Sequence, residues 1–220
     1  MTFADPLPDP LPADPLRMAA EWLAMAWERR EQPNPNAMVL ATSTPEGAPS
    51  ARVVLCKSIE PEPGVVRFVS NYHSRKGREL AANSRAACVL HWDHMHRQVR
   101  LEGVVTRAAL ADSDAYFASR AWASKLGAHA SAQSEPVDSR AALDAKLDEV
   151  TLRYGAAPGS GRDIPRPAHW GGYVLWIDRA ELWVEGAARL HDRASFTRTL
   201  TARPDGSYVG GAWHSTRLQP

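Results

Sequence analysis

Five short valine-rich runs between residues 37 and 108 constrain the fold more strongly than any other feature of the sequence. They read "AMVLATS", "SARVVLCKSI", "VVRFVSN", "AACVLHWD" and "QVRLEGVVTRA", and turn-forming segments such as "TPEGAP" and "EPEPG" separate some of them. β-branched residues favour strands, and strands that follow one another this closely favour antiparallel pairing over alternating βαβ units. After a Gly/Pro-rich loop, strand patterns resume with "GGYVLWI", "RAELWVEG" and the opening of "RLHDRASFTRTL". The sequence therefore predicts a mainly β, α+β domain built around an antiparallel β-barrel.

Helical patterns flank and interrupt these strands. The first predicted helix lies in "DPLRMAAEWLAMAWERREQ", where Asp14 is a natural N-cap, Pro15 takes the first helical position, and apolar residues recur at helical spacing from Leu16 to Trp27. Three further helices are predicted in "SRKGRELAANSR", with Ser74 as its N-cap, in "ALADSDAYFASRA" and in "SRAALDAKLDEVTLRYG". The last two are amphipathic, so each has one face to bury.

Composition narrows the classes of protein. The proline- and aspartate-rich residues 1–14 predict a flexible N-terminal arm, and no linker divides residues 15–220, which we expect to form a single domain. A formal net charge of +1 gives no support to nucleic-acid binding. Cys56 and Cys88 lie in apolar runs and predict buried free thiols. Since no run approaches the roughly 18 apolar residues of a membrane span, and no basic segment precedes an apolar leader, we expect a cytoplasmic protein without a membrane partner.

Cationic and hydroxyl side chains gather in four short segments, a combination that suits phosphate groups. These residues are Arg52 and Lys57; Ser74, Arg75 and Lys76; Tyr116, Arg120 and Ser124; and Gln133 and Ser134. The second set stands where a helix begins, and the free backbone N–H groups there favour an anion as well. The third set is spaced four residues apart, so its members share one face if the helix continues that far. Any one segment alone is typical of solvated surface, but together they predict a phosphorylated ligand.

The segment "RLHDR" adds three cationic or proton-carrying groups at alternate positions. If the segment is a strand, Arg189, His191 and Arg193 point to one face, and Leu190 and Asp192 point to the other. Such a strand would present all three side chains to bound ligands.

The histidine-rich stretch "HWDHMH" has two interpretations. On a strand, His94 and His96 share one face and form a possible metal pair, whereas His91 falls on the other face. The alternative is a polar hairpin turn, which we favour because short histidine-rich tracts match metal templates freely. No metal site is therefore predicted. Nucleophilic catalysis is not indicated either, because the sequence has no GxSxG elbow, Walker loop or dinucleotide fingerprint.

Seven motifs in order along the chain resemble those of the pyridoxine/pyridoxamine 5′-phosphate oxidase family. They are "RVVLCK", "SRKGREL", "RQVRLEG", "YFASR", "QSEP", "PRPAHWGGY" and "RLHDR", and the ending "RLQP" also fits. The resemblance covers about residues 15–220. It implies a homodimeric, FMN-binding split β-barrel of Greek-key, antiparallel topology with peripheral helices and with FMN at the subunit interface. It also implies oxidation of pyridoxine or pyridoxamine 5′-phosphate to pyridoxal 5′-phosphate by O2, with release of hydrogen peroxide and, from the amine, ammonia.

The resemblance assigns roles to individual residues. Those implied for FMN are Arg52, Val53, Val54, Leu55, Cys56, Lys57, Val69, Ser70, Arg75, Lys76, Gln98, Gln133, Ser134, Trp183 and Arg193. Those implied for the substrate phosphate are Lys57, Tyr116, Arg120 and Ser124. Those implied for the pyridine ring, which are also the expected catalytic residues, are Arg189 and His191. The protein would then position the substrate while the cofactor supplies the redox chemistry.

The chain departs from the family pattern within "RAWASKLGAHAS", where Trp122 replaces an arginine and His129 replaces a tryptophan. Its Pro/Asp-rich arm also lacks the basic, tyrosine-containing segment of some members. The alternatives are a related flavin oxidase of the phenazine-pathway type, a non-catalytic FMN- or pyridoxal-phosphate-binding protein, and a metal-dependent role of the histidine cluster. Tyr116, Arg120 and Ser124, which are retained, favour a phosphorylated substrate.

Overall fold

The structure is a computed structural model that describes residues 5–159 and 163–220, so the first four residues of the predicted arm lie outside the described part. The chain divides into two compact units. The barrel unit comprises Met1–Phe68, Asn83–Thr106 and Val174–Pro220, and the helical unit comprises Val69–Ala82 and Arg107–Tyr173.

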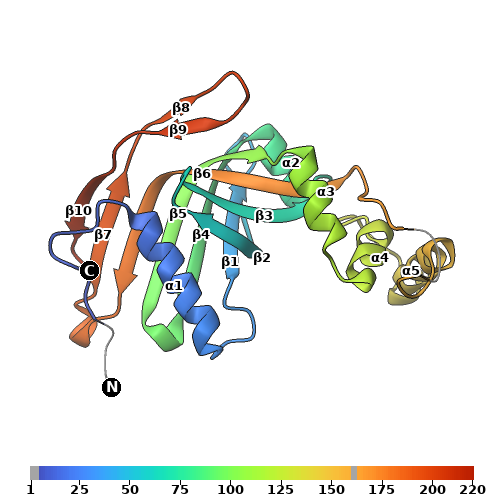
Figure 1. Ribbon diagram of the computed structural model, residues 1–220, viewed down its shortest axis with the longest axis horizontal. Helices are drawn as coiled ribbons and strands as arrows, with labels where there is room; N and C mark the ends of the chain where they lie inside the picture. Colours follow the sequence, from blue (N-terminus) through green and yellow to red (C-terminus); the bar gives the residue numbers. More distant parts are fainter. Residues whose placement is uncertain (1–4, 160–162) are drawn as a thin grey trace. The chain divides into compact units, whose positions relative to one another are not determined.

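Eight strands form one sheet, and six of them close into an antiparallel barrel (Figure 1). The strands are β1 (Ala37–Ser43), β2 (Pro49–Glu60), β3 (Val65–Asn71), β4 (Arg85–Trp92), β5 (Arg97–Arg107), β6 (Trp170–Val184), β7 (Asp192–Thr197) and β10 (His214–Leu218). Their order is β10-β7-β6-β3-β2-β1-β4-β5, and β6 pairs with β5 as well as with β3. This second pairing of β6 closes the barrel, which confirms the predicted fold class.

The barrel closes where two backbones approach each other at a glycine. A Cβ atom added to Gly103 on β5 would lie 1.8 Å from the carbonyl oxygen of Trp176 on β6. Only a residue without a side chain allows this approach. The sequence "RLEGVV" predicts the strand, but it does not indicate which partner strand the glycine meets.

The barrel interior is filled by large apolar side chains. The fully buried ones include Met38, Leu40, Phe68, Leu90, Trp92, Leu101, Leu175, Ile177, Leu182 and Phe196. Cys56 and Cys88 are buried free thiols, as predicted. Burial raises the pKa of the Cys56 thiol to about 12, and burial also raises the pKa of Cys88, so both thiols stay protonated at neutral pH.

Helix α1 (Pro15–Arg29) begins as the sequence predicts, because the Asp14 side chain accepts a hydrogen bond from the Leu16 N–H. The helix contacts β2 within the barrel unit. The predicted apolar face is wrong at its end, because Trp27 is 49% exposed. The buried residues of the helix are Pro15, Leu16, Ala19, Trp22, Leu23 and Ala26. The buried stripe advances by three or four residues from Leu16, and that spacing leaves Trp27 outside the stripe.

Two strand predictions need correction. "GGYVLWI" and the first six residues of "RAELWVEG" lie in the single 15-residue strand β6, in which the intervening Asp178 forms an ion pair with Arg85. The C-terminal segment contains a further two-stranded hairpin of β8 (Leu200–Ala202) and β9 (Tyr208–Gly210) that the sequence did not indicate.

The helical unit contains α2 (Arg75–Ala82), α3 (Leu110–Ala118), α4 (Trp122–Ala130) and α5 (Arg140–Tyr154). Its apolar core consists of Phe117, Leu126, Val150, Ile164 and Trp170. The hydroxyl of Ser74 accepts from the Gly77 N–H, which confirms Ser74 as the cap of α2. Within residues 5–159 and 163–220, no helix is both long and apolar enough to cross a membrane.

Replacing Gly103 by alanine is expected to lower the free energy of unfolding by about 2–3 kcal/mol, or to prevent folding, because the added methyl carbon would collide with the β6 backbone. Urea denaturation followed by circular dichroism measures the change. The matched control is Gly127→Ala in α4, where a Cβ meets no atom within 4 Å; it is expected to gain about 0.5–1 kcal/mol of helix stability. An unchanged urea midpoint for Gly103→Ala would contradict the close approach.

Candidate functional site

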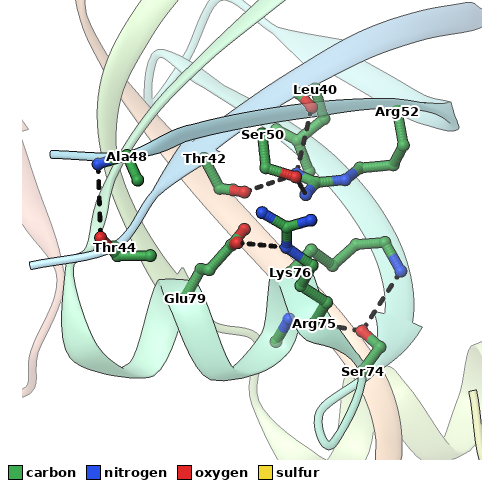
Figure 2. Close-up of polar contacts among 11 residues, drawn as sticks. Leu40, Thr42, Thr44, Ala48, Ser50, Arg52, Ser74, Arg75, Lys76 and Glu79 are labelled. Carbon is green, nitrogen blue, oxygen red and sulfur yellow. Dashed lines mark hydrogen bonds and ion pairs between the residues drawn. The ribbon is translucent and has the colours of Figure 1, made fainter. Parts of the chain in front are cut away.

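Arg52 is held in the barrel unit by three hydrogen-bond acceptors. Its Nη1 atom donates to the carbonyl oxygen of Leu40 at 3.2 Å and to Oγ1 of Thr42 at 2.5 Å. Its Nη2 atom donates to Oγ of Ser50 at 2.6 Å. Figure 2 shows these three acceptors, all from β1 and β2, gathered around one guanidinium group. They fix the direction of Arg52, and no sequence pattern predicts Thr42 or Ser50 as its partners.

Lys57 occupies an irregular position in β2. Cys56 pairs with Phe68, and Ser58 pairs with Arg67, so Lys57 is the extra residue of a β-bulge. A bulge bends its strand and turns a side chain away from the regular alternation. The bulge therefore sets the direction of the Lys57 side chain. The alternation of inward and outward residues in "RVVLCK" does not predict this direction.

In the helical unit, Lys76 lies almost fully buried at the start of α2 (Figure 2). Its Nζ atom donates to Oγ of Ser74 at 3.2 Å and to Oε1 of Gln133 at 2.8 Å. The hydroxyl of Ser70 donates to the same Gln133 oxygen at 3.3 Å. The structure thus brings together Ser70, Ser74, Lys76 and Gln133, which the sequence had placed in three separate segments.

Arg75 and Ser134 have different surroundings. Nε of Arg75 donates to Oε1 of Glu79, one turn along α2, at 2.8 Å. Glu79 is a buried carboxylate, and no sequence motif indicated it as a partner of Arg75. Ser134 is exposed and has a φ of 74°, in the left-handed region that non-glycine residues rarely adopt.

Arg120 carries a buried donor that has no hydrogen-bond partner among the described residues, its Nη1 atom. The guanidinium carbon lies 4.5 Å from the ring centre of Trp170 and 5.5 Å from that of Phe117. The ring of Tyr116 stacks on Trp170 with a centre-to-centre distance of 6.2 Å. Burial lowers the pKa of Arg120, and the nearby Tyr116 partly opposes this shift. A half-buried, oriented cation with a buried, unused donor is suited to bind an anion.

The prediction that Tyr116, Arg120 and Ser124 share one helical face is wrong. Helix α3 ends at Ala118, and α4 begins at Trp122, so Arg120 lies in the break between them. The break is stabilised by the hydroxyl of Ser119, which donates to the carbonyl oxygen of Tyr116. Tyr116 and Arg120 nevertheless both border Trp170, whereas Ser124 is exposed on α4.

The two departures from the family pattern take part in packing. Nε1 of Trp122 donates to the carbonyl oxygen of Gly155 at 2.9 Å, and the Trp122 side chain packs against the core of the helical unit. Nε2 of His129 donates to the carbonyl oxygen of Pro165 at 2.8 Å. Both side chains therefore tie segments of the helical unit together.

The segment "RLHDR" is not the strand that the sequence analysis considered. Residues Ala187–Arg189 form a short 3₁₀ turn, and β7 starts only at Asp192. Ala188 and Arg189 have φ values of 53° and 64°. Such left-handed non-glycine residues cost about 1–3 kcal/mol each, and they reverse the chain before β7. Arg189, His191 and Arg193 therefore do not share one face of a strand.

His191 closes this turn with its own ring. Its Nδ1 atom accepts a hydrogen bond from the Gly186 N–H at 3.2 Å, so the proton of the neutral imidazole lies on Nε2. The ring centre lies 4.7 Å from that of Trp183 on β6. His191 thus presents an Nε2–H donor whose position is set by both the backbone and Trp183.

Arg193 and Gln98 are placed by regular strand pairing. Arg193 lies opposite Trp183 in the β6–β7 ladder, and its Nε and Nη2 atoms donate to Oε1 of Glu181 at 3.1 Å and 3.0 Å. Gln98 lies on β5 opposite His91 of β4. The sequence analysis missed Glu181 as the partner of Arg193. Its one sequence signal is that it precedes Trp183 by two residues, which puts both side chains on the same face of a strand.

The remaining FMN candidates lie on β2 and β3. Val53 is 63% and Leu55 40% exposed on one face of β2, whereas Val54 points to the other face. Val69 and Ser70 belong to the end of β3.

The histidine stretch forms a turn. His91 is exposed on β4, His94 lies in the short 3₁₀ helix Asp93–Met95, and Nδ1 of His96 contacts Oε2 of Glu185 at 2.5 Å. Within the described part of the chain, no group of three or more His, Cys, Asp or Glu side chains could hold a metal ion.

The sequence comparisons give the family. Residues 27–154 match the family described as pyridoxamine 5′-phosphate oxidase, and residues 170–220 match the pyridoxine 5′-phosphate oxidase C-terminal dimerisation region. The chain belongs to the pyridoxamine 5′-phosphate oxidase family. The resemblance inferred from the seven motifs is thereby confirmed. FMN is the cofactor of this oxidase family and of this chain.

Two relatives illustrate how closely the chain follows the family. It is 45% identical over 210 residues to the pyridoxine/pyridoxamine 5′-phosphate oxidase of Gluconobacter oxydans, covering 96% of each chain. It is 47% identical over 207 residues to pyridoxine/pyridoxamine 5′-phosphate oxidase 1 of Ralstonia nicotianae, covering 94% of this chain and 89% of the relative.

Two solved structures share the fold. PhzG from Burkholderia lata, determined in complex with tetrahydrophenazine-1-carboxylic acid, superposes with a TM-score of 0.84 at 30% identity, over the whole of both chains. A pyridoxamine 5′-phosphate oxidase-related, FMN-binding protein of Nostoc punctiforme has a TM-score of 0.68 at 16% identity, covering 94% of this chain and 98% of that one. The second likeness supports the split-barrel fold alone.

The donor set fits the cofactor of the oxidase family. FMN carries a phosphate that cations and hydroxyl donors bind, and the anchored Arg52 and the Ser74–Lys76 pair are groups of this kind. The polar atoms of the flavin ring and ribityl chain need amide and hydroxyl partners, which Gln98, Gln133 and Ser70 can supply. The assignment of each residue to FMN stays a prediction.

Lys76→Met is expected to raise the FMN dissociation constant at least about tenfold, because it removes a buried cation that Ser74 and Gln133 orient. Quenching of flavin fluorescence on titration of the apoprotein measures the affinity. The control is Lys146→Met on the exposed part of α5, for which we expect wild-type affinity. Equal dissociation constants for Lys76→Met and wild type would remove Lys76 from the FMN site.

Proposed function

We propose that this chain is an FMN-dependent oxidase that converts pyridoxine 5′-phosphate and pyridoxamine 5′-phosphate to pyridoxal 5′-phosphate. Two electrons and two protons leave the substrate, and O2 takes them up to form hydrogen peroxide. With the amine, water replaces nitrogen and ammonia is released. The reaction would serve vitamin B6 biosynthesis or salvage in the cytoplasm. The observation that carries the proposal is the buried, unused donor of Arg120 beside Tyr116.

A phosphate group matches the surroundings of Arg120. The guanidinium is held over two aromatic rings, so its direction is fixed before any ligand binds. Its buried Nη1–H has no acceptor among the described residues, and an anionic oxygen would supply one. We further propose that the hydroxyls of Tyr116 and Ser124 bind the same phosphate, whereas the proposed role of Lys57 in phosphate binding rests on the motif resemblance alone. Binding the phosphate contributes to the reaction rate as well as to affinity, because it orients the substrate and so aligns the reacting carbon.

Arg189 and His191 are proposed to hold the pyridine ring. The Nε2–H of His191 is available as a donor because its Nδ1 atom already accepts from Gly186. Arg189 is exposed on the turn before β7, so its cation can meet a ligand without first losing a buried partner. When bound, FMN accepts the electrons from the substrate and passes them to O2.

We propose that FMN is bound by the residues that the family motifs assign to it. The set in the barrel unit is Arg52, Val53, Val54, Leu55, Cys56, Lys57, Gln98, Trp183 and Arg193. The set in the helical unit is Val69, Ser70, Arg75, Lys76, Gln133 and Ser134. Backbone groups of the β2 residues would contribute in place of the apolar side chains.

A second candidate is an oxidase of the phenazine-pathway type. The likeness to PhzG supports it, since that structure covers the whole chain with a TM-score of 0.84. The identity of 30% to PhzG is lower than the 45–47% to the two B6-phosphate oxidases named above. A tricyclic carboxylate has no phosphate, so only the oxidation of B6 phosphates requires a phosphate-binding group around Arg120.

Arg120→Ala is expected to raise KM for pyridoxine 5′-phosphate roughly 10- to 150-fold, which corresponds to loss of about 1.5–3 kcal/mol from a charge-assisted hydrogen bond. Arg120→Lys should restore only part of the loss, because lysine lacks the planar fork. Oxygen uptake by the FMN-loaded protein, together with the absorbance of pyridoxal 5′-phosphate, measures turnover.

The control for this experiment is pyridoxine without phosphate, on which Arg120→Ala and wild type should perform equally poorly. An unchanged KM in Arg120→Ala would contradict the role of Arg120. A wild-type protein that binds FMN but consumes no oxygen with either B6 phosphate would contradict the proposed activity. It would favour a carrier or a phenazine-type substrate.

We also propose that the active form is a homodimer with FMN at the interface. The match of residues 170–220 to a dimerisation region supports a dimer. An apolar patch on the barrel unit supports the involvement of β1 and β2, because Val39, Val53 and Leu55 are 42%, 63% and 40% exposed. Val39 and Val53 are paired directly across the two strands. Exposed apolar side chains that lie together on a sheet are typical of protein–protein contacts.

Val53→Asp is expected to shift the protein from dimer to monomer, because a carboxylate cannot be buried unpaired in an apolar interface. Sedimentation velocity measures the oligomeric state. Leu152→Asp on α5 is the matched control, since Leu152 is 89% exposed and its replacement should leave the dimer intact. A Val53→Asp protein that remains fully dimeric would exclude this patch from the interface.

A further inference from the structure

We propose that Glu185 and His96 are positioning residues. Their contact holds residues 186–191, the site loop, in the conformation that presents Arg189 and His191. The kinetic part of this inference rests on the proposed function, whereas its structural part does not.

Two contacts join Glu185 to the turn between β4 and β5. Nδ1 of His96 lies 2.5 Å from Oε2 of Glu185, and the Glu185 N–H donates to the carbonyl oxygen of His96 at 2.9 Å. One contact uses side chains and the other uses the backbone. Glu185 immediately precedes the site loop, so its position determines where the loop begins.

His96 is itself held by the turn. It has a φ of 54°, and its N–H donates to the carbonyl oxygen of Asp93 at 2.9 Å as the cap of the short 3₁₀ helix. The backbone therefore fixes the position of the His96 Cα atom, and the contact with Glu185 orients the imidazole. A ring held in this way is a firm anchor for a carboxylate.

The middle of the site loop is not packed against the barrel unit. Residues 187–190 are all exposed, and Leu190 is 73% exposed. The loop nevertheless keeps Ala188 and Arg189 in the left-handed region. We infer that the contacts at the two ends of the loop hold this unfavourable conformation, namely those of Glu185 and Gly186 at its start and the packing of His191 on Trp183 at its end.

The loop closes tightly at both ends. A Cβ atom on Gly186 would lie 2.0 Å from the carbonyl oxygen of Leu190, and the Gly186 N–H reaches Nδ1 of His191. At the far end, the carboxylate of Asp192 accepts from Arg217 and from the Leu7 N–H. A shift of Glu185 therefore moves Gly186 directly and weakens the hydrogen bond that orients the His191 ring.

Hydrogen–deuterium exchange of peptides covering residues 186–191 tests the structural part in the FMN-loaded protein. Glu185→Ala and His96→Asn both break the side-chain contact, and asparagine tolerates the left-handed backbone of His96. We expect both variants to exchange at least about fivefold faster in the loop than wild type. Glu185→Gln keeps an acceptor for the His96 Nδ1–H and should exchange as wild type does.

The matched control is Glu60→Ala. Glu60 also makes a partly exposed ion pair, with Arg67 at 2.8 Å, but it lies on β2, away from the loop in sequence. Loop exchange in this variant should equal that of wild type. Unchanged loop exchange in both Glu185→Ala and His96→Asn would overturn the inference, whatever the activity.

Steady-state kinetics with pyridoxine 5′-phosphate tests the functional part. We expect Glu185→Ala to lower kcat/KM about tenfold, to change the FMN dissociation constant less than twofold, and to be rescued by Glu185→Gln. A general loss of structure would weaken FMN binding too. Faster loop exchange with unchanged kcat/KM would overturn the positioning role. An inactive wild type would instead refute the proposed function and leave the exchange data to decide on the loop.

Discussion

The double pairing of β6 is the constraint on which the rest of the barrel unit depends. This strand pairs with β3 on one side and β5 on the other, and it also carries β7 and, through it, β10. The close approach of Gly103 to Trp176 permits the closure, because any side chain at this position of β5 would separate the two backbones. Trp183 and Glu181, at the far end of the same strand, contact His191 and Arg193. Closure of the barrel and placement of these site residues therefore depend on one strand.

The cationic side chains proposed to bind ligands share a second feature, since polar neighbours within their own unit hold most of them in fixed directions. Thr42 and Ser50 direct Arg52, Gln133 directs Lys76, and Glu181 directs Arg193 (Figure 2 shows the first of these groups). Arg120 is held instead by aromatic rings. Groups that are fixed before the ligand arrives lose less conformational entropy on binding, and this is how a protein contributes to a reaction whose redox chemistry belongs to the cofactor.

Irregular backbone occurs where the site residues lie. Lys57 is the extra residue of a bulge, Arg120 lies in a helix break, Ser134 has a positive φ, and Arg189 follows another left-handed residue. Regular strands and helices could not direct these side chains in the same way, because their alternation is fixed. The surrounding regular structure supplies the free energy that keeps these residues in unfavourable backbone conformations.

The sequence by itself determined the strand runs, the antiparallel barrel, the Asp14 and Ser74 helix caps, the buried cysteines and the family. These features depend on local chemistry: β-branched alternation, a carboxylate or hydroxyl beside free N–H groups, and motifs in a fixed order. Only the tertiary structure decided that "RLHDR" begins as a left-handed turn, that α3 and α4 separate at Arg120, that Trp27 is exposed, that Glu181 is the partner of Arg193, and that Glu185 is the partner of His96. Each of these depends on contacts between residues far apart in the chain or on backbone dihedrals that no local pattern encodes, which is why periodicity alone predicted them wrongly or missed them.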